Sequence, residues 1–245
     1  MKRSTLCSVA LALALALVAV TVTVLAQTAS GPVPASEDLA RVRFIHASPD
    51  AAELDVLLND TGLVTNSAFG EISAYTELAA GTYTVTLRLT DEATPLVTET
   101  VVVTETDYTL AAAGTLAADT TELELLRLMD DNTAPAPGMV RARFVHLVPD
   151  VPFPVSIAID GDLLFEDIKY RDVTPYTTVD AGSHTLQLLV SGVEVATGTL
   201  TVSPNSVYSF FAVGLAYGTP EVAIVQVLDE SYDHHIWLPL VARGG

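Results

Sequence analysis

The sequence RVRFIHASPD at residues 41–50 returns as RARFVHLVPD at residues 141–150, an offset of 100 residues. The identical pairs are Arg41/Arg141, Arg43/Arg143, Phe44/Phe144, His46/His146, Pro49/Pro149 and Asp50/Asp150, with Tyr108/Tyr208 farther downstream at the same offset. A repeat of this length is the size of a small domain. The pattern therefore indicates a domain that has been duplicated.

Short alternating segments separated by turn residues fill each repeat. The clearest is residues 82–90, where Tyr83, Val85 and Leu87 share one face and threonines lie between them. The first repeat is predicted to have seven strands, at residues 41–47, 54–58, 72–78, 82–90, 96–103, 108–113 and 122–128. We therefore predict an all-β protein with two tandem immunoglobulin-like β-sandwich domains, preceded by an N-terminal signal peptide.

The N-terminus has the pattern of a targeting segment. Lys2 and Arg3 precede an apolar run at residues 6–25, and a small-residue cleavage site ends at Ala26. Cleavage there would remove Cys7, the one cysteine of the chain, and with it any disulfide or thiolate site. The expected location is secreted or at the cell surface. The alternative is an uncleaved membrane anchor, since about 20 apolar residues can span a bilayer.

The boundaries that follow from these patterns divide the chain into six parts. They are a signal peptide at 1–26, a spacer at 27–39, the first β-sandwich repeat at 40–130, a Pro/Ala linker at 131–139, the second repeat at 140–230 and a C-terminal tail at 231–245. The charge is strongly acidic, with 11 Lys+Arg against 30 Asp+Glu and a formal net charge of −19. Such a surface repels nucleic acid and anionic lipid, so neither is expected as a partner.

Several short motifs resemble those of a known bacterial family. They are Phe44 to Asp50, Leu54-Asp55-Val56, Ser73-Ala74-Tyr75, Ala80-Gly81-Thr82-Tyr83, and Tyr108-Thr109 with Gly114. The chain is similar, on these residues, to the family called domain of unknown function 4397. Its members look like secreted or surface-attached β-sandwich modules, often in tandem, and the resemblance carries over no catalytic residue. In the second repeat Val155 stands where an offset of 100 places Asp55, and His184 replaces Tyr83.

His46 and His146 are the candidates for chemistry in the repeated motif. An imidazole that pairs with Asp50 or Asp55 would have the geometry of a base or a metal ligand. Alternation, however, places His46 on the inward face with Phe44, where an Asp or the backbone would satisfy its ring. Asp50 would then bond the backbone of the turn that follows. We favour this structural role.

Hydrolytic motifs are weak in this sequence. Ser48 lies two residues after His46, but the second repeat has Val148 at that position, and no Gly-x-Ser-x-Gly elbow occurs. Glycoside hydrolysis needs two positioned carboxylates, but among 30 acidic residues many pairs can be chosen, so the number of acids does not indicate such an enzyme. No catalytic residue is therefore predicted.

Acidic turns offer oxygen ligands for calcium, but none has EF-hand spacing. The turns are Asn59-Asp60, Asp130-Asp131-Asn132 and Asp160-Gly161-Asp162, and the tail adds Asp233-His234-His235 as a zinc or copper candidate. Ordinary turns and a solvated tail are favoured, so no metal or cofactor is predicted. Five tyrosines placed on strands at equivalent repeat positions are expected to pack in cores and corners rather than stack on sugars. They are Tyr75, Tyr83, Tyr108, Tyr176 and Tyr208.

The sequence thus favours a secreted, non-enzymatic binding or cell-envelope interaction module whose partner is an unknown extracellular protein or glycan. Two alternatives stay open. One is a carbohydrate-active or other extracellular hydrolase of unrecognised type, and the other is a calcium-stabilised surface protein.

Overall fold

The computed structural model describes residues 39–117 and 121–232, and every regular element in these ranges is a β-strand. The predicted signal peptide, most of the spacer and the histidines of the tail lie outside the described residues. Within the described ranges, no helix has the length and hydropathy of a membrane span.

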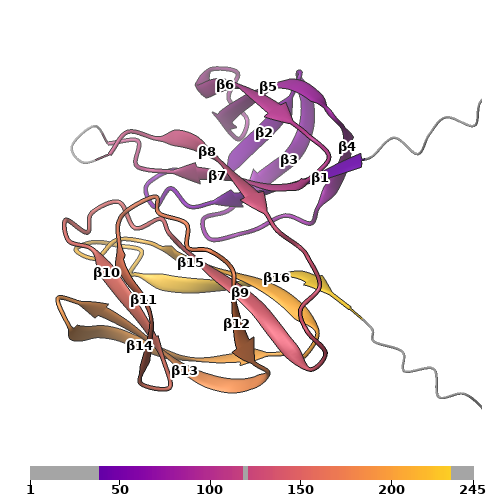
Figure 1. Cartoon of the computed structure of the whole chain (residues 1–245). Coiled ribbons are helices and arrows are strands. Elements are labelled where there is room, and N and C mark those ends of the chain that lie inside the picture. The colour runs from indigo at the N-terminus through magenta and orange to yellow at the C-terminus, as the bar shows by residue number, and fades with distance from the viewer. Residues whose placement is uncertain (1–38, 118–120, 233–245) are drawn as a thin grey trace, which may run out of the picture. The chain divides into compact units, whose positions relative to one another are not determined.

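The first repeat contains eight strands (Figure 1). They are β1 (Leu39–His46), β2 (Leu54–Leu58), β3 (Thr61–Ser67), β4 (Thr76–Ala79), β5 (Gly81–Leu89), β6 (Pro95–Val103), β7 (Asp107–Ala113) and β8 (Glu124–Asp130). One sheet has the order β4-β1-β7-β8 and the other the order β3-β2-β5-β6. Strands β1 and β7 run parallel, and the other neighbours are antiparallel.

The second repeat follows the same plan with eight more strands. They are β9 (Met139–His146), β10 (Val155–Ile159), β11 (Asp162–Ile168), β12 (Thr177–Asp180), β13 (Gly182–Val190), β14 (Val193–Val202), β15 (Ser206–Val213) and β16 (Ala223–Ser231). Its sheets have the orders β12-β9-β15-β16 and β11-β10-β13-β14. The prediction of two tandem β-sandwiches is confirmed. Their connectivity differs from that of an immunoglobulin constant domain, whose seven strands form ABED and CFG sheets.

The first repeat has one strand more than the sequence pattern predicted. The missed strand is β3, an edge strand whose polar, half-exposed residues show little alternation. Asn59 and Asp60 both have positive φ and reverse the chain within two residues. Strand β3 therefore begins at Thr61. The predicted strand at residues 72–78 is replaced by the shorter β4.

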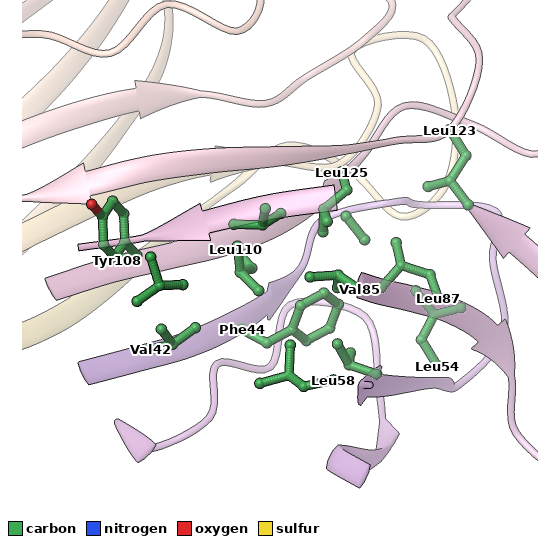
Figure 2. Close-up of a cluster of buried hydrophobic side chains, with 14 of the residues drawn as sticks. Val42, Phe44, Leu54, Leu58, Val85, Leu87, Tyr108, Leu110, Leu123 and Leu125 are labelled. Atoms are coloured by element: carbon green, nitrogen blue, oxygen red, sulfur yellow. The ribbon is translucent and has the colours of Figure 1, made fainter. Parts of the chain in front are cut away.

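Each sandwich has its own apolar core between its two sheets. Figure 2 shows the core of the first, where Phe44 lies among Val42, Leu58, Val85 and Leu110. Alternation along β1 turns Val42 and Phe44 into this core, and full burial of a side chain like Phe44 contributes about 1.5–3 kcal/mol. The second core contains the equivalent Phe144.

The offset between the repeats changes from 100 to 101 residues before the second strand. Leu54 pairs with Leu89 in the first repeat, and Val155 pairs with Val190 in the second. The segment after Asp150 is thus one residue longer than the segment after Asp50. Ser156, not Val155, is therefore the structural equivalent of Asp55, which corrects the alignment made from the sequence at constant offset.

Candidate functional site

His46 is fully buried at the end of β1, and backbone groups satisfy its ring. The Ser48 N–H donates to Nδ1 at 3.3 Å, and Nε2 lies 3.0 Å from the Ala52 carbonyl oxygen. Burial lowers the pKa of His46, and these bonds match a neutral ring with its proton on Nε2. The predicted inward position and backbone partner are confirmed.

The two carboxylates proposed as partners of His46 bond elsewhere. Asp50 accepts the N–H groups of Leu116 and Ala117 at 2.8 and 2.9 Å, so the expectation that it bonds the following turn is wrong. Its carboxylate instead faces the loop that follows β7. Asp55 accepts from the Asn66 N–H and pairs with Arg88 at 3.1 Å. Neither carboxylate therefore orients the imidazole.

Ser48 does not form a nucleophile–base pair with His46. Its hydroxyl donates to Asp50 at 3.4 Å, whereas its backbone N–H takes the His46 ring nitrogen. The side chain that would attack a carbonyl is thus aimed at an acid, and the ring that would activate it is already engaged by the backbone.

The acidic turns are occupied by contacts within the protein. Asn59 and Asp160, in the turns after β2 and β10, accept the N–H groups of Thr84 in β5 and Thr185 in β13. Asp131 pairs with Arg141 at 2.5 Å, and this partner holds the Asp131 pKa well below its usual range. Among residues 39–117 and 121–232, no group of three or more metal-ligating side chains comes together.

Two arginines of the repeated motif form ion pairs with acidic residues of the other repeat. Arg43, in β1, donates to Asp229 in β16 at 2.6 Å, and Arg143, in β9, donates to Asp130 at the end of β8. All four side chains are almost completely buried. Each repeat thus neutralises a buried carboxylate of the other, which joins the two repeats by a reciprocal pair of ion pairs.

Two tyrosines also bind the carboxylates of these ion pairs. We call the pairs Arg43–Asp229 and Arg143–Asp130, together with these tyrosines, the crossed network. The Tyr75 hydroxyl donates to Asp130 at 2.6 Å and the Tyr176 hydroxyl to Asp229 at 3.0 Å. The guanidinium of Arg43 lies 4.4 Å from the Tyr75 ring centre. Burial raises the pKa of both tyrosines, so they stay neutral donors. This corrects the expectation of simple core packing for the pair.

The other tyrosines behave as predicted for corners and cores. Tyr108 is buried, and its hydroxyl lies 2.6 Å from that of Thr104, at the loop before its own strand. Tyr208 accepts the Ser203 N–H at 3.2 Å in the same way. Both are corner contacts of the kind seen in other sandwiches.

A third apolar cluster lies beside the crossed network and draws on both repeats. Ile45 and Val145, one residue before each histidine, lie in it with Phe211. The outer face of β1, which the sequence left unassigned, is therefore buried against the second repeat.

A cavity of about 520 Å³ opens at the His146 corner of the second sandwich. Its walls are mostly apolar and come from β10, β13, β14 and the loops after β9 and β15, with Val155, Leu188, Val190 and Ala196 among them. Volumes of roughly 300–1,000 Å³ with apolar walls and few polar groups are typical of small-molecule sites. This cavity is the candidate functional site.

His146 is the buried polar group of the cavity wall. It is 1% exposed, and the Val148 N–H donates to its Nδ1 at 3.3 Å. Nδ1 is therefore an acceptor, which places the proton of the neutral ring on Nε2. This Nε2 is buried and has no hydrogen-bond partner among the described residues. Burial lowers the His146 pKa to about 4, so the ring is neutral at physiological pH.

The difference from the first repeat has a local cause. The longer segment after Asp150 reads Val-Pro-Phe-Pro where the first repeat has Ala-Ala-Glu, and no carbonyl takes the place of Ala52. Wall residues are also smaller. Structurally equivalent pairs are Leu54/Val155, Leu89/Val190 and Leu123/Val222. Shorter side chains and a displaced segment together leave room beside the ring.

Exposed aromatic side chains frame the mouth of the cavity. Phe153 is 57% exposed and Tyr217 is 81% exposed, and both line the cavity. Asp150 holds the Tyr217 loop by accepting the N–H groups of Ala216 and Tyr217 at 2.8 and 2.9 Å. Sequence reasoning missed both aromatics. The extra residue of the Val-Pro-Phe-Pro segment is a signal for Phe153, and no local pattern marks Tyr217.

These features define a tandem β-sandwich protein with a ligand-sized cavity in its second repeat. The model of the family described as Domain of unknown function (DUF4397) matches residues 40–153 and 148–234. The chain belongs to this family, as its motifs predicted. A search of the curated proteins gives no match.

Proposed function

We propose that the protein is a secreted, non-enzymatic binding module and that the cavity beside His146 is its binding site. The observation that carries the proposal is a 520 Å³ apolar cavity whose wall holds a buried ring nitrogen without a partner. An unpaired buried donor costs about 1–3 kcal/mol, which a bound acceptor would recover. Exposed Phe153 and Tyr217 at the mouth add apolar surface that a ligand would cover.

The surroundings of the histidines support binding over catalysis. At His46 the ring is engaged on both nitrogens by backbone groups, and Ser48 is directed to Asp50. At His146 the side chain two residues on is Val148, so the corner with space for a substrate lacks an adjacent hydroxyl nucleophile there. The apolar walls also favour a ligand with an apolar body over a glycan, whose hydroxyls need several polar partners.

Titration of the full chain with the neutral dye Nile red tests the proposal. We expect saturable binding at one site, seen as a blue-shifted rise in fluorescence. Ala196→Phe, which places a ring in the cavity, is expected to weaken binding at least tenfold. The matched control is Val97→Phe, the structurally equivalent position in β6 of the first repeat, which should leave the affinity unchanged.

Two outcomes would contradict the proposal. One is the absence of saturable dye binding, or binding that Ala196→Phe leaves unaltered. The other is turnover of a nitrophenyl ester or glycoside faster than by free imidazole that disappears in His46→Gln or His146→Gln, which would make the protein an enzyme.

A further inference from the structure

We propose that the cavity takes a neutral, largely apolar small molecule that carries a hydrogen-bond acceptor oxygen, such as a ketone or an ester, and that His146 Nε2–H donates to this oxygen. This assignment rests on the proposed binding function and adds the chemical class of the ligand.

The polarity of the hydrogen bond follows from the backbone. Val148 N–H occupies Nδ1, so a neutral ring presents Nε2 as a donor and has no free lone pair for a ligand's own donor. The first repeat shows the same arrangement already satisfied, because the Ala52 carbonyl oxygen lies 3.0 Å from His46 Nε2. A carbonyl oxygen from a ligand would therefore play at His146 the part that Ala52 plays at His46.

Charge excludes an anionic form of such a ligand. Glu221 lines the cavity, and the chain has a formal net charge of −19. A carboxylate that left water for this cavity would meet negative charge and one neutral donor, which does not compensate its desolvation. A ketone or ester oxygen needs one hydrogen bond, and the cavity offers one.

The apolar body of the ligand follows from the rest of the wall. Val155, Leu188 and Val190 come from the core face of the second sandwich, and the exposed Phe153 adds a further apolar wall. Each apolar Å² that these residues remove from water contributes about 25 cal/mol, so the walls supply affinity and the histidine supplies selection for the oxygen.

Benzophenone and diphenylmethane test the assignment, since they share two rings and differ by the carbonyl oxygen. We expect the full chain to bind benzophenone at least tenfold more tightly than diphenylmethane in calorimetric or dye-displacement titrations. In His146→Leu the ratio should fall to about one while diphenylmethane still binds. His46→Leu, the matched control, should keep the wild-type ratio, and the anion 4-benzoylbenzoate should bind wild type more weakly than benzophenone.

A wild-type ratio near one, or tighter binding of 4-benzoylbenzoate, would overturn the ligand class while the binding function stands. Failure of both neutral probes to bind would overturn the binding function as well. If His146→Leu does not fold, the ring ¹⁵N spectrum of the wild-type chain decides the matter. The His146 Nε2 resonance must shift with benzophenone and not with diphenylmethane, and an unchanged resonance contradicts the assignment.

Discussion

The two repeats place the same histidine at the same corner, yet its ring ends in different surroundings. In the first repeat the Ala52 carbonyl accepts from His46 Nε2, and Leu54 packs in the adjoining core. In the second repeat one extra residue separates Asp150 from its strand, and Val155 replaces Leu54. His146 lines a cavity there, and its buried Nε2 has no hydrogen-bond partner among the described residues. After duplication, the motif can thus keep its structural role in one repeat. A change in the neighbouring loop can open a cavity at the same motif in the other repeat.

The largest expected loss of stability comes from the buried ion pairs between the repeats, to which each repeat contributes one arginine. Arg43→Leu leaves Asp229 buried without its counter-ion, and removal of one partner of such a pair costs about 3–5 kcal/mol. Arg143→Leu should cost somewhat less, because Asp130 keeps the guanidinium of Arg43 at 3.6 Å. Urea unfolding of the full chain measures both.

The control for the crossed network is Arg88→Leu. Arg88 pairs with Asp55 inside the first repeat and is about one-third exposed, so we expect a loss of about 1 kcal/mol or less. The double variant Arg43→Leu with Asp229→Leu should recover much of the single loss, because it removes both charges. Single variants no more costly than Arg88→Leu would show that the crossed pairs do not hold the repeats together.

The two buried histidines should contribute differently to the loss of folding stability at acidic pH. Burial lowers the His146 pKa from 6.5 to about 4, so as pH falls through this window the unfolded chain takes up a proton that the folded ring refuses. Stability present above pH 6.5 is therefore lost on acidification, by on the order of 3 kcal/mol at pH 4. At His46 the Ala52 carbonyl opposes the lowering of the pKa, so its loss should be smaller.

Urea unfolding of wild type, His146→Phe and His46→Phe at pH 7, 5.5 and 4 measures this difference. Asp172 opposes the lowering of the His146 pKa, and Tyr170 and Glu221 are other titratable groups nearby. All three remain in every variant. His146→Phe should lose the least stability on acidification. His184 is unchanged in all three proteins. Asp160 raises its pKa, so its contribution to stability is lost as pH rises through that raised value and is the same in each. Parallel curves for the three proteins would refute the prediction.

The asymmetric loop also accounts for what the sequence could and could not predict. Alternation along one strand was enough to turn His46 inward with Phe44, because a strand face is a local property. The partner of Arg43 lies 186 residues away, so no local pattern contains it. The cavity depends on an insertion that a constant offset of 100 hides, and this offset also misassigned Val155 to the Asp55 position. Packing between repeats and loop registers therefore required the structure.

Asp50 and Asp150 give a smaller, matched test of the loops that frame each corner. Each carboxylate accepts two backbone N–H groups. Asp50 is exposed and Asp150 half-exposed, so replacement by Ala should cost about 1–2 kcal/mol. Asp150→Ala also releases the Tyr217 loop at the cavity mouth, so it should weaken Nile red binding, whereas Asp50→Ala should not. Equal effects of the two variants on dye affinity would show that the Tyr217 loop does not contribute to the binding site.

The smallest expected change in stability tests whether the second repeat has unfilled space beside Val155, where the first repeat is packed around Leu54. Leu54→Val removes a methylene from a packed core and should cost about 1 kcal/mol. Val155→Leu adds one methylene beside existing space, so it should be neutral or stabilise the fold by up to about 0.8 kcal/mol. The same substitution in a fully packed core would cost about 1–3 kcal/mol through overpacking. A loss of that size for Val155→Leu, measured by urea unfolding, would mean that the second corner is as full as the first, and the proposed site would lose its basis.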